Sequence, residues 1–142
     1  LITSTSGALL DGGDTGGADI VATGANAVVT VTTITGIGTT DNPLETDIAT
    51  LVAAVTSSGI VNLVETDAID LVSVTTADGR ITVESGGTLT ATDVDLSATD
   101  DDTNDVSLTT TAGDIAVVSV NAGSTNDVTL TEIGRASCRA RE

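Results

Sequence analysis

Apolar and polar residues alternate along many short stretches of this chain. Examples are Ile81-Thr82-Val83, Val94-Asp95-Leu96, Val106-Ser107-Leu108, Val118-Ser119-Val120 and Val128-Thr129-Leu130. A period of two is the signature of a half-buried β-strand. Glycines such as Gly59, Gly79 and Gly113 separate these stretches and supply corners. The pattern therefore predicts an all-β protein made of short strands and frequent turns.

One heptapeptide occurs twice. Residues 103–109 and residues 125–131 are identical except that Ser107 in the first copy is replaced by Thr129 in the second, and the copies lie 22 residues apart. A repeat of this length, built of short strands and turns, matches one coil of a parallel β-helix. We therefore predict a right-handed parallel β-helix, or β-solenoid, with about 20–25 residues per coil.

The composition agrees with a narrow core. The chain has 28 Thr and 17 Val, which are β-branched and suit strands, and it has no Phe, Trp, Tyr or Met. A core without rings has to be filled by Val, Ile, Leu and Ala, which suits a thin interior better than a thick one. An immunoglobulin-like β-sandwich is the alternative fold, but such domains rely on a buried Trp or a corner Tyr.

Two features concern individual strands. Aspartate followed by Ile or Val is expected to open a strand at residues 19, 47, 93 and 114. The aliphatic residues within 44–55 have the spacing of a helix face, and Asp41-Asn42-Pro43 is a helix-start signal. Because Val, Ile and Thr are weak helix formers, we favour a strand there over a helix.

Residues 36–54 contain Gly36-Ile37-Gly38, Asn42-Pro43-Leu44 and Leu51-Val52-Ala53 in that order. This segment resembles the G-I-G…N-P-L-x-T…L-x-A pattern of filamentous-haemagglutinin-like bacterial exoproteins. Residues 79–83 and 113–117 are similar to the G-x-I-x-V coils of the same family, and the resemblance covers residues 1–131. It implies a right-handed β-helix, export to the bacterial cell surface, and a role in adhesion or biofilm formation. It also implies a much longer protein, with any secretion signal, anchor or carbohydrate module outside this chain.

The last residues differ in composition from the rest. Residues 1–131 contain 19 acidic residues and a single basic one, Arg80, whereas three arginines and the only cysteine, Cys138, fall in residues 132–142. Residues 132–139 resemble a translated sequencing adapter. We therefore predict a β-solenoid repeat segment over residues 1–131 and a non-native or disordered tail over residues 132–142.

The net charge of −17 limits the partners. Such a surface repels nucleic-acid phosphates and anionic lipids, so we expect no nucleic acid partner. No stretch approaches the roughly 18 apolar residues of a membrane span, so we expect no membrane insertion. The resemblance to filamentous-haemagglutinin-like exoproteins implies a secreted or bacterial cell-surface location, with host cells, neighbouring cells or matrix contacted through modules outside this chain. Uncapped coil ends predict self-association.

Residues 100–105 resemble the start of a D-x-D-x-N calcium loop, in which hard oxygen ligands alternate. The candidate ligands are Asp100, Asp102, Asn104 and Asp105. The loop pattern has Gly at its sixth position, where this chain has Asp105, so a solvated corner between coils is the alternative. Residues 11–20 are similar to the calcium nonapeptide G-G-x-G-x-D-x-U-x but lack its fourth-position Gly. No cofactor other than calcium is predicted.

Groups for catalysis are scarce. The chain has no His and no Lys, so the usual pairs of nucleophile and base cannot be assembled. Two carboxylates can cleave a glycosidic bond, which leaves a polysaccharide-processing β-helix as an alternative. Arg80 is expected at a coil edge beside Asp78 or Glu84. Together with the resemblance to filamentous-haemagglutinin-like exoproteins, these observations predict a non-catalytic stalk segment of a large adhesin, with a calcium-binding extracellular repeat as the first alternative.

Overall fold

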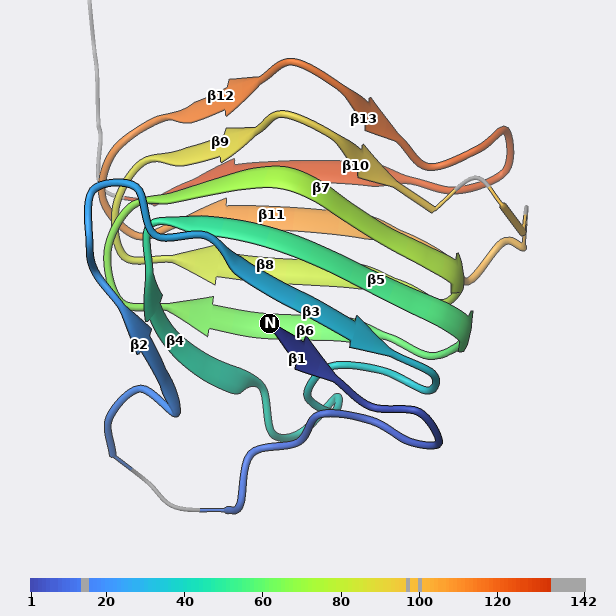
Figure 1. The fold of residues 1–142 in the computed structure, drawn as a ribbon. Coiled ribbons are helices and arrows are strands. Elements are labelled where there is room, and N and C mark those ends of the chain that lie inside the picture. The colour runs from blue at the N-terminus through green and yellow to red at the C-terminus, as the bar shows by residue number, and fades with distance from the viewer. Residues whose placement is uncertain (14–15, 97, 100, 134–142) are drawn as a thin grey trace, which may run out of the picture.

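The computed structural model describes residues 1–13, 16–96, 98–99 and 101–133 as a β-solenoid of about five turns with about 22 residues per coil. Figure 1 shows the coils stacked from the N-terminal one, in blue, to the C-terminal one, in orange and red. Each coil contributes strands to two sheets, and every pairing between named strands is parallel. None of the described residues belongs to a helix that is long and apolar enough to cross a membrane.

Sheet A contains β1 (Ile2–Thr3), β3 (Val29–Thr33), β5 (Thr50–Ser58), β7 (Ile69–Asp78), β10 (Val94–Asp95) and β13 (Val120–Asn121). It also contains β9 (Leu89–Ala91), which pairs with β7, and β12 (Ile115–Val117), which pairs with β9. Sheet B contains β2 (Ile20–Ala22), β4 (Leu44–Ile48), β6 (Val61–Glu65), β8 (Ile81–Ser85), β11 (Val106–Thr110) and β14 (Val128–Glu132). Strands alternate between the two sheets along most of the chain, as expected for a winding coil.

The predicted β-solenoid is confirmed. An immunoglobulin-like sandwich requires antiparallel sheets, so the parallel pairing rules out that alternative. The segment with helical spacing forms β4 and β5, in agreement with the strand that we favoured. The repeated heptapeptide stacks on itself, because Val106 pairs with Val128 and Leu108 pairs with Leu130. The repeat read from the sequence is therefore one physical coil.

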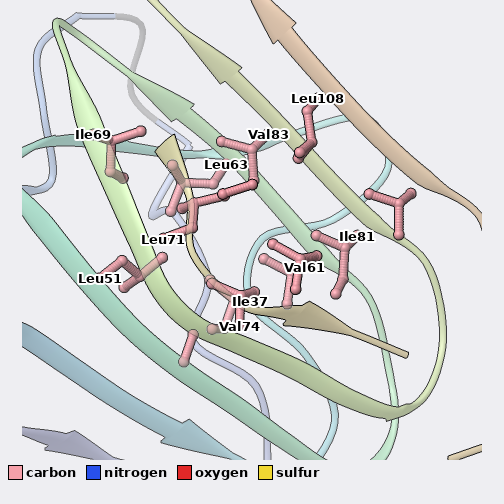
Figure 2. Close-up of a cluster of buried hydrophobic side chains, with 14 of the residues drawn as sticks. Ile37, Leu51, Val61, Leu63, Ile69, Leu71, Val74, Ile81, Val83 and Leu108 are labelled. Atoms are coloured by element: carbon pink, nitrogen blue, oxygen red, sulfur yellow. The ribbon is translucent and has the colours of Figure 1, made fainter. Parts of the chain in front are cut away.

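The core consists of aliphatic columns that run along the solenoid. One column of sheet B passes through Leu44, Leu63, Val83, Leu108 and Leu130. One column of sheet A passes through Val31, Ala53, Val74, Val94 and Val120. Figure 2 shows side chains of both sheets meeting in one layer between them. Each side chain thus covers the one below it, which is how a ring-free core excludes water.

Coil length varies because the corners vary, while the strands keep their register. Along the column that begins at Leu44, the number of residues between one coil and the next is largest from Val83 to Leu108. This step contains the loop between β10 and β11, which carries the predicted calcium residues. The extra residues therefore lie at one corner and do not disturb the stack.

Three of the four Asp-Ile or Asp-Val pairs open strands as expected, at Ile20, Val94 and Ile115. The fourth expectation is wrong, since Asp47 and Ile48 are the last two residues of β4. Burial does not separate the two cases, because Val94 at the start of β10 and Ile48 at the end of β4 are 0 % and 1 % exposed. A local pair pattern cannot tell the start of a strand from its end.

Sheet A bends in its C-terminal coils. The N–H groups of residues 92 and 93 both bond to the carbonyl of Leu71, at 3.0 and 3.2 Å. One coil further on, the N–H groups of residues 118 and 119 both bond to the carbonyl of Ala91, at 2.8 and 3.3 Å. Two residues opposite one are a β-bulge, which bends a strand. The bulges stack, so the bend follows the solenoid, as the paths of β9 to β10 and β12 to β13 show (Figure 1).

The glycines at the corner between sheets A and B are required by close backbone contact. Gly79 has a φ of +140°, and a Cβ atom there would lie 2.3 Å from the carbonyl oxygen of Gly59. A Cβ on Gly59 would in turn lie 2.2 Å from the carbonyl oxygen of Thr35. Only glycine allows the coils to stack this closely at that corner.

The β-solenoid extends at least one residue beyond residue 131, where we predicted that it ends. Glu132 lies in β14 and pairs with Thr110, and the N–H of Ile133 bonds to the carbonyl of Thr110 at 2.7 Å. The first residue that we assigned to the tail therefore belongs to the solenoid. The remainder of that assignment, residues 134–142, lies outside the described residues.

Candidate functional site

A column of buried polar side chains runs through the solenoid along the sheet B strands. Its members in register are Thr46, Glu65, Ser85 and Thr110, and each has 1 % or less of its surface exposed. Thr46 is the middle residue of β4, whereas the other three end their strands, beside a corner where backbone groups need partners. The hydroxyl of Ser85 donates to the carbonyl of Asp67 at 2.5 Å, and that of Thr110 donates to the carbonyl of Gly113 at 3.3 Å. The column therefore satisfies corner backbone groups that the strand ladders leave unpaired.

Glu65 is the only ionisable member of the buried core among the described residues. Its Oε2 accepts a hydrogen bond from the Thr46 hydroxyl at 2.6 Å, and its Oε1 accepts from the N–H of Ile48 at 3.1 Å. The N–H of Asp67 lies 3.4 Å from the same Oε1. Two of these donors belong to the preceding coil and the third to its own corner, so the carboxyl group joins two coils.

Burial raises the pKa of Glu65 above its ordinary value of 4.5. Removal from water disfavours the charged form, and the carboxylate of Asp67 adds repulsion. The hydrogen bonds from Thr46, Ile48 and Asp67 act in the opposite direction and lower the pKa, but burial dominates. The fold therefore holds this proton more tightly than the unfolded chain does.

Two further carboxylates converge on Glu65. Asp47, Glu65 and Asp67 each place a carboxylate oxygen within 4.8 Å of the others. Asp67 is exposed and Asp47 half-buried, so the group opens to solvent at the corner between sheets B and A. Carboxylate oxygens are the ligands that calcium prefers in proteins. The three residues thus offer the type of ligand atom that a divalent cation site uses.

A second carboxylate group lies at the N-terminal end. Asp11, Asp19 and Glu45 also place carboxylate oxygens within 4.8 Å of one another. Asp11 Oδ2 accepts from Asn42 Nδ2 at 2.6 Å, and Asp19 Oδ2 accepts from the N–H of Glu45 at 3.3 Å. Asp11 and Asp19 come from the nonapeptide-like segment, although the pattern gave no reason to expect Glu45 beside them.

The structure assigns individual contacts to the predicted calcium residues. Asp100 lies outside the described residues, and Asp102 is exposed. Asn104 is buried, and its Nδ2 donates to Asp78 Oδ1 at 3.1 Å and to the carbonyl of Thr99 at 3.2 Å. Asp105 Oδ1 accepts from the N–H of Asp127 at 2.9 Å. Asn104 and Asp105 therefore fasten the long loop to neighbouring coils, and calcium binding by this loop stays a prediction.

Arg80 lines an open hollow of about 380 Å³ at the edge of the solenoid. The other charged residues that line it are Asp78 and Asp101. Arg80 therefore lies near Asp78 as expected, but its Nη2 donates to the hydroxyl of Thr40 at 2.8 Å. Asp101 Oδ1 accepts from the N–H and the hydroxyl of Thr103, at 3.1 and 3.0 Å. Both carboxylates thus take part in holding the long loop.

The sequence analysis missed the role of Glu65, although a signal for it exists. Three strands of sheet B share a five-residue pattern, in which positions one and three are apolar, position two is polar, and position five is Glu, Ser or Thr. The pattern occupies residues 61–65, 81–85 and 106–110. By alternation the fifth position points inward, so a polar residue there has to find a buried partner. Glu84 and Val64, at the fourth position, show that residue type alone does not separate the inner from the outer face.

The fold is a repetitive β-solenoid, and a column of buried polar side chains runs along its sheet B strands. Comparison with known protein families, with characterised proteins and with solved structures finds no match to this chain. The resemblance to filamentous-haemagglutinin-like exoproteins therefore depends on the sequence segments given above.

Proposed function

We propose that this chain is a structural stalk segment of a large secreted or surface-exposed bacterial adhesin, with no catalytic role. Contact with host cells, neighbouring cells or matrix is made by other modules of a longer protein. The observation that supports this proposal most directly is the run of aliphatic columns through successive coils, from Leu44 to Leu130. Such a stack sets a distance by the number of its coils.

The mechanism of a stalk follows from the way that coils depend on one another. Each coil buries its upper and lower faces only against its neighbours, so stability is shared along the array. Outward positions such as Thr82, Ser107 and Thr129 carry hydroxyl groups that remain hydrated. The acidic exterior favours solubility and disfavours collapse onto other acidic surfaces. These properties suit a rod that separates functional modules.

Duplication of one coil tests the proposal. A second copy of residues 103–124 inserted after residue 124 adds one complete repeat. We expect the rod to lengthen by about 4.8 Å in small-angle X-ray scattering and to melt at the same temperature or higher. The control inserts the same segment in shuffled order. A duplicated chain that is no longer than the original, or that melts like the shuffled control, contradicts the stalk proposal.

The calcium-binding alternative is favoured by the two convergent carboxylate groups. A ligand that binds only the folded state raises the melting temperature by mass action. We would titrate the chain with CaCl₂ and compare Asp47→Asn with Asp102→Asn. Loss of the shift in Asp47→Asn assigns calcium to the corner beside Glu65, and loss in Asp102→Asn assigns it to the long loop. No shift in the unaltered chain at millimolar Ca²⁺ removes this alternative.

The remaining alternative, a polysaccharide-processing β-helix, would use the hollow lined by Asp78, Arg80 and Asp101. Release of reducing or unsaturated ends from polysaccharides is the measurement that tests it. We expect no turnover, because Asp78 accepts from Asn104 and Asp101 accepts from Thr103. Turnover that is lost in Asp101→Asn would overturn the non-catalytic proposal.

A further inference from the structure

The hollow of about 380 Å³ that contains Arg80 lies on the side of the solenoid, at the corner where β7 leads into β8. It has a coil on either side. The carbonyl of Arg80 accepts from the N–H of Val61 in the coil before, and the N–H of Ile81 donates to the carbonyl of Asp105 in the coil after, both at 3.0 Å. Strands β4 and β14 lie beyond these two coils. The opening of the hollow therefore does not depend on where the stack ends.

Arg80 has no ionic partner within the described part of the chain. Its Nη2 donates to the hydroxyl of Thr40 at 2.8 Å, and its side chain makes no other polar contact there. Acidic partners are abundant, since Arg80 is the single basic residue beside 19 acidic ones in residues 1–131. A guanidinium has five N–H donors in a planar fork that matches a carboxylate. Thr40 thus holds the group in place and leaves most of its donors available.

Two carboxylates of the same hollow bond to the protein through one oxygen each. Asp78 Oδ1 accepts from Asn104 Nδ2 at 3.1 Å, and Asp101 Oδ1 accepts from the N–H and the hydroxyl of Thr103, at 3.1 and 3.0 Å. The other oxygen, Oδ2, of each carboxylate accepts no hydrogen bond from the described residues. The hollow thus combines available donors on a cation with available acceptors on two anions.

We propose that this hollow binds a small zwitterion of the α-amino acid class. The carboxylate of the ligand accepts hydrogen bonds from the guanidinium of Arg80, and its ammonium group donates to Asp78 and Asp101. A volume of about 380 Å³ is within the range of small-molecule sites and accommodates such a ligand. The inference depends on the fold and not on the stalk role.

Charge selects a zwitterion over a simple ion. A ligand with only negative charge would meet two carboxylates in the hollow and a chain of net charge −17. A ligand with only positive charge would leave Arg80 unpaired and would be repelled by it. A molecule with both groups on one carbon pairs each charge of the hollow with its opposite.

Titration of the ¹⁵N-labelled full chain at pH 7, followed through the amide signals of Gly59 and Gly79 in the lining, measures binding by NMR. Glycine is the probe. Acetate carries only its carboxylate and methylammonium only its ammonium group, and ionic strength is held constant. We expect saturable shifts with glycine at a dissociation constant on the order of 1–10 mM, and at least about tenfold weaker binding of the two partial probes. The same spectra verify that each variant is folded.

Two substitutions separate the two charges. Arg80→Gln should weaken both glycine and acetate at least about tenfold, because the carboxylate loses its partner. Asp101→Asn should weaken glycine but strengthen acetate, because it removes a negative charge while its amide oxygen can still accept from Thr103. Asp70→Asn is the matched control. It removes the same charge outside the hollow, from a carboxylate that accepts from the Thr92 hydroxyl at 2.8 Å, and should leave glycine binding unchanged.

Several results would overturn the proposal. One is the absence of a saturable shift up to about 100 mM glycine. Acetate that binds as tightly as glycine would mean a site for anions only, and methylammonium that does so would mean an acidic surface only. Equal effects of Asp101→Asn and Asp70→Asn would indicate a response to net charge alone. Glycine binding that appears only in Asp100→Asn would make Asp100, which lies outside the described residues, the ionic partner of Arg80.

Discussion

The Oε1 atom of Glu65 accepts a hydrogen bond from the N–H of Ile48 at 3.1 Å, seventeen residues earlier in the chain. Glu132 repeats this relationship with Ile115, at 2.8 Å and with the same separation of seventeen residues. Both glutamates end a sheet B strand, and both isoleucines lie in the coil below. At the two intermediate positions of the column, Ser85 and Thr110 are too short to reach back and bond to corner carbonyls instead. A glutamate at this position therefore links one coil to the next.

Removal of the Glu65 carboxyl group should destabilise the chain. Glu65→Ala leaves the Thr46 hydroxyl and the Ile48 N–H without their acceptor, and each unsatisfied buried group costs about 1–3 kcal/mol. We expect a loss of about 2–4 kcal/mol in the free energy of unfolding, measured by urea denaturation. Glu84→Ala is the control, since Glu84 lies on the outer face and should change stability little. Equal effects of the two substitutions would refute the idea that the Glu65 carboxyl group links two coils.

The contribution of Glu65 to the free energy of unfolding should increase as the pH falls towards pH 4.5. The pKa of Glu65 is raised by burial in the folded chain, whereas the unfolded chain has the ordinary value near 4.5. The folded state thus binds the proton more tightly than the unfolded state. The stabilisation that results is complete below about pH 4.5 and is lost as the pH rises through the pKa of Glu65 in the folded chain. Glu65→Gln should remove the dependence due to this group. Identical pH profiles of the two chains between pH 4 and pH 7 would contradict the expectation.

Replacement of Gly79 by alanine should disrupt the corner between sheets A and B. The added Cβ would lie 2.3 Å from the Gly59 carbonyl oxygen, at a φ of +140° that side chains rarely adopt. We expect a loss of about 2–4 kcal/mol from strain and overpacking, measured by thermal or urea denaturation. Gly12→Ala is the matched control, because nothing lies within 4 Å of its Cβ position and its φ is not positive. A neutral Gly79→Ala would mean that the coils can separate at this corner at little cost.

A cavity in an aliphatic column should cost more than a similar truncation on the outer face. Leu63 is 1 % exposed and stacks between Leu44 and Val83. Leu63→Ala should cost about 2–5 kcal/mol, through lost burial and the void that it leaves. Val64→Ala, at the neighbouring outward position, should cost only about 0.5 kcal/mol. Denaturation curves of the two variants that superimpose would argue against a core of stacked columns.

The alternation of residues and the heptapeptide repeat predicted most of the fold. Ser107 and Thr129 identify equivalent positions, and the structure pairs them directly. Local patterns failed where a strand end had to be distinguished from a strand start, as at Asp47 and Ile48, because alternation has no direction. Glu65 was missed for a related reason. Its burial depends on the register of the coil below, which its own neighbours in sequence do not specify.

The sequence by itself determined that the chain is all-β, coiled and ring-free in its core, because period-two alternation and a repeat length are local properties of the chain. Only the tertiary structure decided which acidic groups meet. Asp47, Glu65 and Asp67 converge because the end of β6 and the corner that follows it lie over the end of β4. The length of each corner fixes that superposition, and the residues of a single coil do not determine how the next coil lies on it.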